Sequence, residues 1–183
     1  RGLSPHALVS ALRDATPPDT VLATDVGAHK IFVTQAWTAT DPLGFLVTNG
    51  LSSMGFGLPA AIAAAKVFPN RPVIAFLGDG GFAMTVHELE TAKRLGAAPL
   101  IVVCCDRALS IIKVAQSELG LAHKGVDFSP VDWARVAEGF GVESHDVSTV
   151  PALIEIVERW LSDRRPVVVA ASIDPSRYPK ISY

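Results

Sequence analysis

Two aspartates at the ends of apolar runs are the residues of this chain best suited to chemistry. Asp79 stands among glycines in "GDGG", Gly78 to Gly81, and Asp106 follows the run "PLIVVCC" 27 positions later. Glycines let backbone amides approach an anion, and a carboxylate among them can face a cation that the anion also binds. Mg²⁺ prefers such a set of carboxylate and phosphate oxygens. The pattern predicts a magnesium and phosphate site, with an ordinary Gly-Asp-Gly turn as the alternative.

The common nucleotide-binding fingerprints do not occur in the sequence. It contains no glycine-rich loop that ends in Gly-Lys-Ser or Gly-Lys-Thr, and no G-x-G-x-x-G opens a helix after the first apolar run. The sequence therefore disfavours ATP and dinucleotides as ligands.

Composition restricts the class of protein. The 183 residues are 49% hydrophobic, which predicts one globular domain over residues 1–183, and a net charge of −2 with scattered basic residues argues against nucleic acid or an anionic membrane as a partner. The adjacent cysteines Cys104 and Cys105 form no disulfide framework, which favours the reducing cytoplasm. The longest apolar run, "LPAAIAAAKVF", is too short to span a bilayer.

Six short β-rich runs alternate with helical patterns, and they are what must position the two aspartates. Several of the runs are apolar throughout, which is typical of strands buried on both faces. We therefore expect a doubly wound α/β fold, with a mainly parallel six-stranded sheet and helices on both faces. The six runs are "TVLAT", "GFLVT", "PVIAFLG", "PLIVVCC", "GVESHDV" and "PVVVAASI".

Local signals predict where helices begin and end. Ser4-Pro5, Ser129-Pro130 and Thr149 precede helical patterns, and Thr85 with Glu88 predicts a capping box ahead of a helix that ends at Gly96. The segment "GFGLPAAIAAAKVF" is apolar nearly all round, which predicts a helix buried under other structure. The tail "DPSRYPKISY" is expected to form an extended strap over a neighbouring surface.

Polar and glycine residues follow the predicted strands at the edge where ligands bind in such sheets. They are Asp25, Gly27 and His29 after the first strand, Asn49 and Gly50 after the second, Asp79 to Gly81 after the third, and Asp106 after the fourth. The residues between Asp79 and Asp106 predict a loop, a capped helix, a turn and a strand, which is one crossover to a neighbouring parallel strand. Both carboxylates should then lie at one edge.

This combination resembles the thiamine-diphosphate-binding motif. The segments "TDVGAHKIF", "TNGLSSMGFGLPAAIAAA", "GDGGFAMTVHELETAKRL" and "VDFSPVDWARVAEGFGV" are similar, in this order, to the C-terminal diphosphate-binding domain of acetolactate synthases and related 2-oxoacid decarboxylases. The resemblance covers about Ser4 to Ile173. It implies thiamine diphosphate and Mg²⁺ as cofactors, and a small 2-oxoacid as the substrate of a lyase or transferase that acts as a decarboxylase or carboligase.

The resemblance also implies roles for individual residues. Asp79 and Asp106 would bind Mg²⁺ through their side chains, and Ala108 through its carbonyl oxygen. Met54 would support the bent, V-shaped conformation of the cofactor. The implied cofactor-binding residues are Gly27, Ala28, His29, Leu51, Ser53, Met54, Gly78, Asp79, Gly80, Gly81, Leu109, Ser110 and Ile111.

Three positions depart from the family pattern. Many members have two asparagines where this chain has Cys105 and Asp106, and the extra charge of Asp106 predicts a tighter dependence on Mg²⁺. Biosynthetic acetolactate synthases carry a tryptophan at the position of Ala115, so we expect a roomier pocket here.

The family's catalytic glutamate belongs to a separate pyrimidine-binding domain of the same or a neighbouring chain, and no segment here resembles that domain. We expect a part of a larger homodimeric or tetrameric enzyme, inactive without that domain. The alternative is a binding or assembly module of the same fold that has lost turnover.

Overall fold

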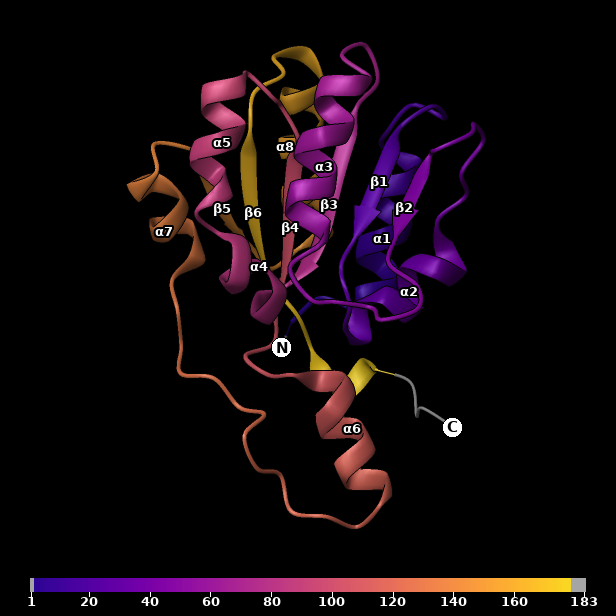
Figure 1. Ribbon diagram of the computed structural model, residues 1–183, viewed down its shortest axis with the longest axis vertical. Helices are drawn as coiled ribbons and strands as arrows, with labels where there is room; N and C mark the ends of the chain where they lie inside the picture. The colour runs from indigo at the N-terminus through magenta and orange to yellow at the C-terminus, as the bar shows by residue number, and fades with distance from the viewer. Residues whose placement is uncertain (1, 179–183) are drawn as a thin grey trace.

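The predicted sheet is confirmed. The structure, a computed structural model that describes residues 2–178, contains one sheet of six parallel strands in the order β2-β1-β3-β4-β6-β5 (Figure 1). The strands are β1 (Val21–Thr24), β2 (Phe45–Val47), β3 (Val73–Gly78), β4 (Leu100–Cys105), β5 (Glu143–Val147) and β6 (Val167–Ser172). All six coincide with the β-rich runs of the sequence.

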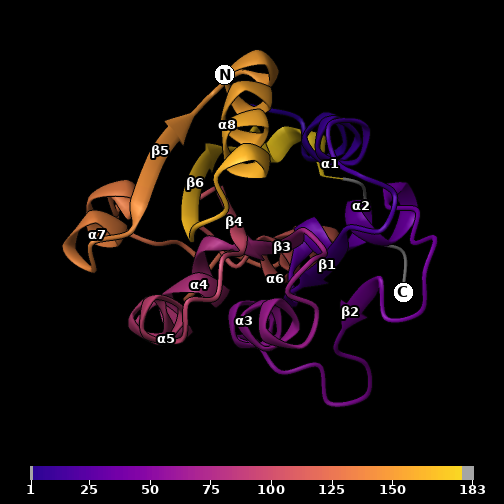
Figure 2. The ribbon, with the colours of Figure 1, turned by 90° about the horizontal axis from the view of Figure 1, so that it is seen from above.

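Helices cover both faces of this sheet, as Figure 2 shows from above. One face carries α1 (Pro5–Asp14), α2 (Ala28–Ala36) and α8 (Val150–Ser162), and the other carries α3 (Gly57–Val67), α5 (Glu88–Leu95) and α7 (Trp133–Gly139). The short helix α4 (Asp79–Thr85) continues β3 directly. Helix α6 (Ser110–Glu118) lies apart, beyond the carboxyl ends of the strands (Figure 1). The predicted doubly wound arrangement follows.

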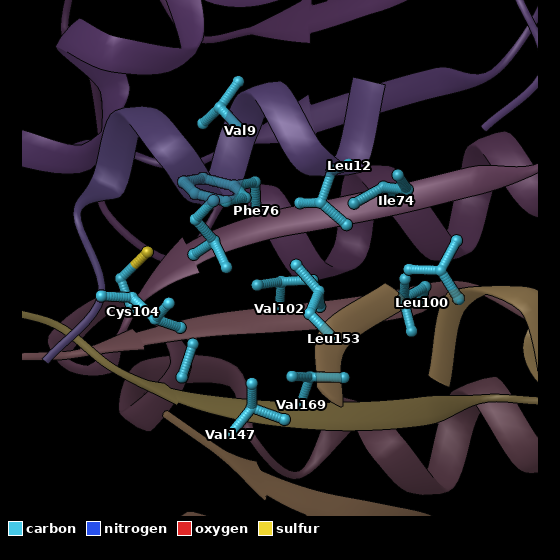
Figure 3. Packing of buried hydrophobic residues seen from close by; sticks show 14 of the residues in the cluster. Val9, Leu12, Ile74, Phe76, Leu100, Val102, Cys104, Val147, Leu153 and Val169 are labelled. Carbon is cyan, nitrogen blue, oxygen red and sulfur yellow. The ribbon is translucent and has the colours of Figure 1, made fainter. Parts of the chain in front are cut away.

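The core consists of two apolar layers, one on each face of the sheet. Alternate residues of a strand point to opposite faces, so Ile74 and Phe76 of β3 join the first layer while Ala75 and Leu77 join the second. Figure 3 shows the first layer, where strand side chains meet Leu12 of α1 and Leu153 of α8. Because both layers consist of buried apolar side chains, the polar residues at the strand ends are the part of each strand left for a ligand.

Three predictions about local structure near helix starts are wrong. Thr85 ends α4 rather than capping α5, and its hydroxyl has no hydrogen-bond partner among the described residues. The loop expected after Asp79 is therefore a helix. The helix expected at Ser129-Pro130 begins only at Trp133, where Asp132 accepts a hydrogen bond from the Arg135 amide at 2.9 Å.

The other helix ends agree with the sequence. Proline begins α1, Thr149 precedes α8, and Gly96 ends α5 with a φ of 61°, the left-handed conformation that glycine adopts without strain.

Two expectations about coverage need correction. Helix α3 is buried on one side only, since Pro59, Ala63 and Val67 face away from the sheet and are exposed. The start of the C-terminal tail is a 3₁₀ helix, η1 (Pro175–Arg177), rather than an extended strap, while residues 179–183 of that tail lie outside the described residues. Within the described part of the chain, every helix is too short or too polar to cross a membrane.

Candidate functional site

The carboxyl ends of β1, β3 and β4 meet at one edge of the sheet. Strands β3 and β4 are direct neighbours, with Gly78 opposite Cys104 in the ladder, so the residues that follow them emerge side by side. A cavity of about 40 Å³ lies here, lined by the starts of α2, α4 and α6 together with Met54. The predicted convergence of polar strand ends is therefore present for β1, β3 and β4, whereas Asn49 and Gly50 after β2 are exposed and lie outside the cavity lining.

The cavity gathers all the predicted site residues except two. Leu51 and Ser53 are exposed and lie outside its lining, and Leu51 is 98% exposed. The lining also includes four residues that sequence reasoning did not assign to the site: Val26, Cys104, Ile112 and Tyr178. Val26 and Ile112 adjoin predicted positions in the chain, and Cys104 lies two residues before Asp106. Tyr178, by contrast, follows the last strand and has no local signal that would have revealed it.

Asp79 is the central polar residue of the cavity. It begins α4, only 2% of it is exposed, and its two oxygens accept hydrogen bonds from the amides of Gly80 at 2.8 Å and Arg107 at 2.7 Å. Arg107 has a φ of 60°, an uncommon conformation outside glycine, and it turns the chain after β4 so that its amide faces Asp79. The Asp79 carboxylate thus links the ends of the two neighbouring strands.

Burial raises the pKa of Asp79 to about 6, and the negative charge of Asp106 acts in the same direction. Two carboxylates that repel each other in a buried site are stabilised together when a cation lies between them. The electrostatics of this edge therefore favour a bound divalent ion.

Asp106 is held in place by the start of α6. The Ser110 hydroxyl donates to its Oδ2 at 2.6 Å, and the Ala108 amide donates to its Oδ1 at 3.2 Å. Ala108 itself pairs with Asp127 in an isolated bridge whose hydrogen bonds use the Arg107 carbonyl and the Leu109 amide, both at 2.8 Å. The Ala108 carbonyl takes no part in those two bonds, so it can serve as a third oxygen ligand.

No group of three or more His, Cys, Asp or Glu side chains suited to a metal occurs in the described residues. Two carboxylates and one carbonyl give three protein oxygens, and Mg²⁺ commonly takes its remaining ligands from phosphate and water. The donor set therefore fits a magnesium ion that arrives with a phosphate group better than one held by protein alone.

Amides for an anion come from the helix starts around the cavity. The Leu109 amide donates a hydrogen bond to the Val126 carbonyl, and the Gly80 amide donates one to Asp79. Neither amide is therefore available to an anion. The first amides of α6, at Ser110 and Ile111, and of α2, at Ala28 and His29, have no acceptor within their own helix. Of the predicted cofactor-binding residues, Ala28, His29, Ser110 and Ile111 therefore offer backbone donors, whereas Leu109 and Gly80 do not.

His29 contributes an unpaired nitrogen to the same cavity. The residue is 3% exposed, and its buried Nε2 has no hydrogen-bond partner among the described residues. Burial lowers the pKa of His29 to about 4, so the ring is neutral near pH 7. A Cβ atom on Gly27 would lie 2.8 Å from this ring and one on Gly78 would lie 3.1 Å from it. The two glycines therefore make room for the imidazole at the cavity wall.

The cavity is small because side chains fill its surroundings, but wider grooves adjoin it. One of about 530 Å³ shares Asp79, Gly80 and Leu109, and one of about 290 Å³ shares Asp106, Ala108, Ser110 and Tyr178. The small cavity gathers the oxygens and amides that could bind a metal and an anion, and the remainder of a larger ligand would extend into a groove.

Comparison with known proteins agrees with the chemistry of this edge. Residues 25–171 match the family described as "Thiamine pyrophosphate enzyme, C-terminal TPP binding domain". The acetolactate synthase of Bacillus subtilis (strain 168) is 30% identical over 94% of this chain and 30% of its own length. The catabolic acetolactate synthase of Raoultella terrigena is 33% identical over 94% of this chain and 31% of its own length.

A third relative is the acetolactate synthase isozyme 1 large subunit of Escherichia coli (strain K12). It is 30% identical over 98% of this chain and 33% of its own length. The chain thus spans about a third of the length of the curated relatives it matches.

Proposed function

The chain belongs to the thiamine pyrophosphate enzyme family, as a C-terminal TPP-binding domain of the acetolactate synthase type, and from this we propose that it holds thiamine pyrophosphate through Mg²⁺ at the edge formed by β1, β3 and β4. We further propose that it serves a decarboxylase or carboligase that acts on a small 2-oxoacid. The observation that carries the proposal is the placement of Asp79 and Asp106 at the ends of neighbouring parallel strands, beside helix-start amides that have no acceptor within their own helices.

The metal and the diphosphate would be held by different groups of this chain. Asp79, Asp106 and the Ala108 carbonyl would bind Mg²⁺, while the first amides of α2 and α6 and the His29 ring would face diphosphate oxygens. Gly78 and Gly81 would let the His29 ring and the Asp25 carboxylate pack directly against the start of α4, which fixes the wall beside the diphosphate. Hydrogen bonds already hold the Asp79 and Asp106 carboxylates in place, which would reduce the entropy lost when the ligand binds.

Thiamine pyrophosphate supplies a carbon nucleophile that can attack a carbonyl and then stabilise negative charge on that carbon. This chain would contribute the positioning of the cofactor. Met54 lines the cavity from the segment before α3, where its apolar side chain would support the bent form of the cofactor. Because Met54 has no ionisable group, we assign it a supporting role and no proton transfer.

We also propose that residues 1–183 are one domain of a larger homodimeric or tetrameric assembly. The chain matches about a third of each relative, and the wide groove of about 530 Å³ is lined by Met84, Phe128, Val131 and Trp133, of which Met84 and Val131 are exposed. A pyrimidine-binding domain of the same or a neighbouring chain would cover this groove and provide the catalytic glutamate. Cytoplasmic location stays a prediction.

Titration calorimetry of the full chain with thiamine pyrophosphate tests this proposal. We expect binding with Mg²⁺ present and at least about a hundredfold weaker binding in Asp79→Asn, which removes a metal ligand. Asp132→Asn is the matched control, because Asp132 also accepts a helix-start amide but lies outside the cavity. Absence of binding by the wild-type chain, with the pyrimidine-binding domain present, would refute the proposal.

A second measurement separates an enzyme from an assembly module that has lost turnover. The chain combined with its pyrimidine-binding domain should release carbon dioxide from pyruvate, benzoylformate or an oxalyl-type acid. Cofactor binding without turnover of any of the three would favour the assembly module.

A further inference from the structure

Asp25 is a buried carboxylate at the same edge that no metal or anion role explains. It directly follows β1, is 1% exposed, and forms no ion pair with a basic side chain of the described residues. A buried charge of this kind is costly unless hydrogen bonds compensate it. Burial indeed raises the pKa of Asp25, while backbone amides oppose the change.

The compensating amides come mainly from the turn before α3. Gly55 donates to both oxygens of Asp25, at 3.1 and 2.9 Å, and Val26 donates to Oδ1 at 2.7 Å. The amides of Phe56 and Gly57 also stabilise the charged form. Every hydrogen bond to this carboxylate is thus donated by a backbone N–H, which only an acceptor can satisfy.

That turn has little else to fix it. Residues 48–56 form neither strand nor helix, and Gly55 has a φ of 83°, a left-handed conformation suited to glycine. A Cβ atom on Gly55 would lie 3.1 Å from Thr85 at the end of α4, so the turn also passes close to that helix. The Asp25 carboxylate is therefore the main polar anchor of the backbone on either side of Met54.

Asp25 also touches the helix that begins with Asp79. A Cβ atom on Gly81 would lie 2.5 Å from Asp25 Oδ2, so α4 packs directly on the carboxylate and tolerates only glycine there. One side chain thus contacts three parts of the cavity wall: the end of β1, the turn that carries Met54, and the first turn of α4.

We propose that Asp25 is a positioning residue for Met54. It fixes the turn through Gly55 so that Met54 lies at a set distance from the Asp79 end of the cavity, which is the geometry that a bent cofactor requires. A methionine side chain is flexible and cannot hold such a position unless its backbone is fixed. This inference rests on the proposed function, because only a cofactor held at its diphosphate end needs a support at a defined distance.

The test compares wild type with Asp25→Asn in the full chain, with the pyrimidine-binding domain supplied. Asparagine keeps the size of the side chain but turns an NH₂ group toward backbone N–H donors. Three quantities are measured: the affinity for thiamine pyrophosphate with Mg²⁺, the rate at which the thiazolium C2 proton of the bound cofactor exchanges with deuterium, and deuterium uptake by the backbone of residues 53–57 without cofactor. Leu153→Ala, a core variant at a residue outside the cavity lining, controls for lost stability.

If Asp25 positions Met54, the substitution Asp25→Asn should affect C2 exchange more strongly than cofactor affinity. Affinity should fall by less than about tenfold, because the metal and diphosphate groups are intact, while C2 exchange should slow by about tenfold to a hundredfold from misplacement of the support. Deuterium uptake should rise at residues 53–57. Leu153→Ala should leave the C2 exchange of bound cofactor unchanged. In the double variant Asp25→Asn with Met54→Ala, the two losses should not add.

Unchanged C2 exchange in Asp25→Asn, an equal loss in Leu153→Ala, or additive losses in the double variant would each overturn the inference. If Asp25→Asn does not fold, Gly55→Ala disturbs the same turn from the other side and must show the same stronger effect on C2 exchange than on affinity. Failure of wild-type chain to bind the cofactor would instead refute the proposed function, so the two failures are distinguishable.

Discussion

At the scale of the residue, the site depends on acidic side chains whose ionised form is destabilised by the fold. Asp79 has a pKa of about 6 because it is buried and because Asp106 is near. Since this folded pKa lies above the usual value of 3.8, the contribution of Asp79 to stability is fully present below about pH 3.8 and is lost as pH rises through about 6. At neutral pH the chain without metal therefore holds a repelling pair that a divalent ion would relieve.

The first prediction is a pH dependence of cofactor binding. Because Mg²⁺ requires the ionised carboxylate, affinity for thiamine pyrophosphate with Mg²⁺ should be level above about pH 6 and fall by about tenfold per pH unit below it. Calorimetry between pH 5 and pH 8 measures this. A midpoint near the ordinary pKa of an aspartate would show that Asp79 is not the titrating ligand.

Asp106→Asn should change both the metal dependence and that midpoint. Loss of the Asp106 charge weakens the attraction for Mg²⁺, and it also removes one cause of the raised pKa of Asp79. We expect the Mg²⁺ concentration for half-maximal cofactor binding to rise by about tenfold. The midpoint of the pH dependence of binding should move to lower pH. The expectation fails if the Mg²⁺ dependence is the same in wild type and variant.

At the scale of the element, the site is made by packing helix starts against strand ends. Helix α4 follows β3 without a loop, and its first turn contains two glycines. Gly81 lies against Asp25, and Gly80 lies against Leu109 and Phe128. A Cβ on Gly80 would lie 3.1 Å from Leu109, which is tighter than ordinary contact. The glycines of "GDGG" are thus required by close packing between elements as well as by approach to an anion.

Gly81→Ala should therefore reduce cofactor binding. The new Cβ would lie 2.5 Å from Asp25 Oδ2, so α4 or Asp25 must move, at a cost of roughly 1–3 kcal/mol in the free energy of unfolding. We expect lower thermal stability and at least about tenfold weaker binding of thiamine pyrophosphate.

The matched control is Gly139→Ala in α7, where an added Cβ meets no atom within 4 Å. That substitution should leave binding unchanged and stabilise the chain by up to about 1 kcal/mol, because alanine favours helix over glycine. Equal effects of the two substitutions on binding would contradict the packing argument.

At the scale of the whole molecule, the described chain holds one side of a site. Its small cavity gathers the candidate metal and anion ligands, and wider grooves lie beside it. Large apolar side chains such as Leu51, Leu119 and Met84 are exposed near the strand carboxyl ends or on α6 and its continuation. Exposed apolar groups of this size favour coverage by another protein surface.

The prediction at this scale is that the chain of residues 1–183 binds thiamine pyrophosphate with Mg²⁺ but does not turn over a 2-oxoacid. Addition of the pyrimidine-binding domain should restore carbon dioxide release, which a coupled assay with pyruvate measures. Turnover by the chain alone would show that a residue of this domain provides the function assigned to the missing glutamate.

The sequence by itself determined the sheet and most of the site. Apolar runs of strand length favour strands buried on both faces, which made β1, β3, β4 and β6 predictable, while the half-buried β2 and β5 were indicated by their β-rich residues and their alternation with helical patterns. Strand ends in a parallel sheet share one edge, so Asp79 and Asp106 were expected together. Local helix signals were less reliable. The hydroxyl of Thr85 fits a capping box, but packing of α4 at the end of β3 decided otherwise.

Only the tertiary structure decided the contacts between segments distant in the chain. Gly55 meets Asp25 across 30 positions, and Tyr178 enters the cavity from beyond the last strand; neither contact has a local pattern. The raised pKa of Asp79 likewise depends on burial and on a neighbour 27 positions away. Sequence periodicity reports which face of an element is buried, but the partners that meet there are set by how the elements pack, and this packing is what converts two predicted acids into a candidate metal site.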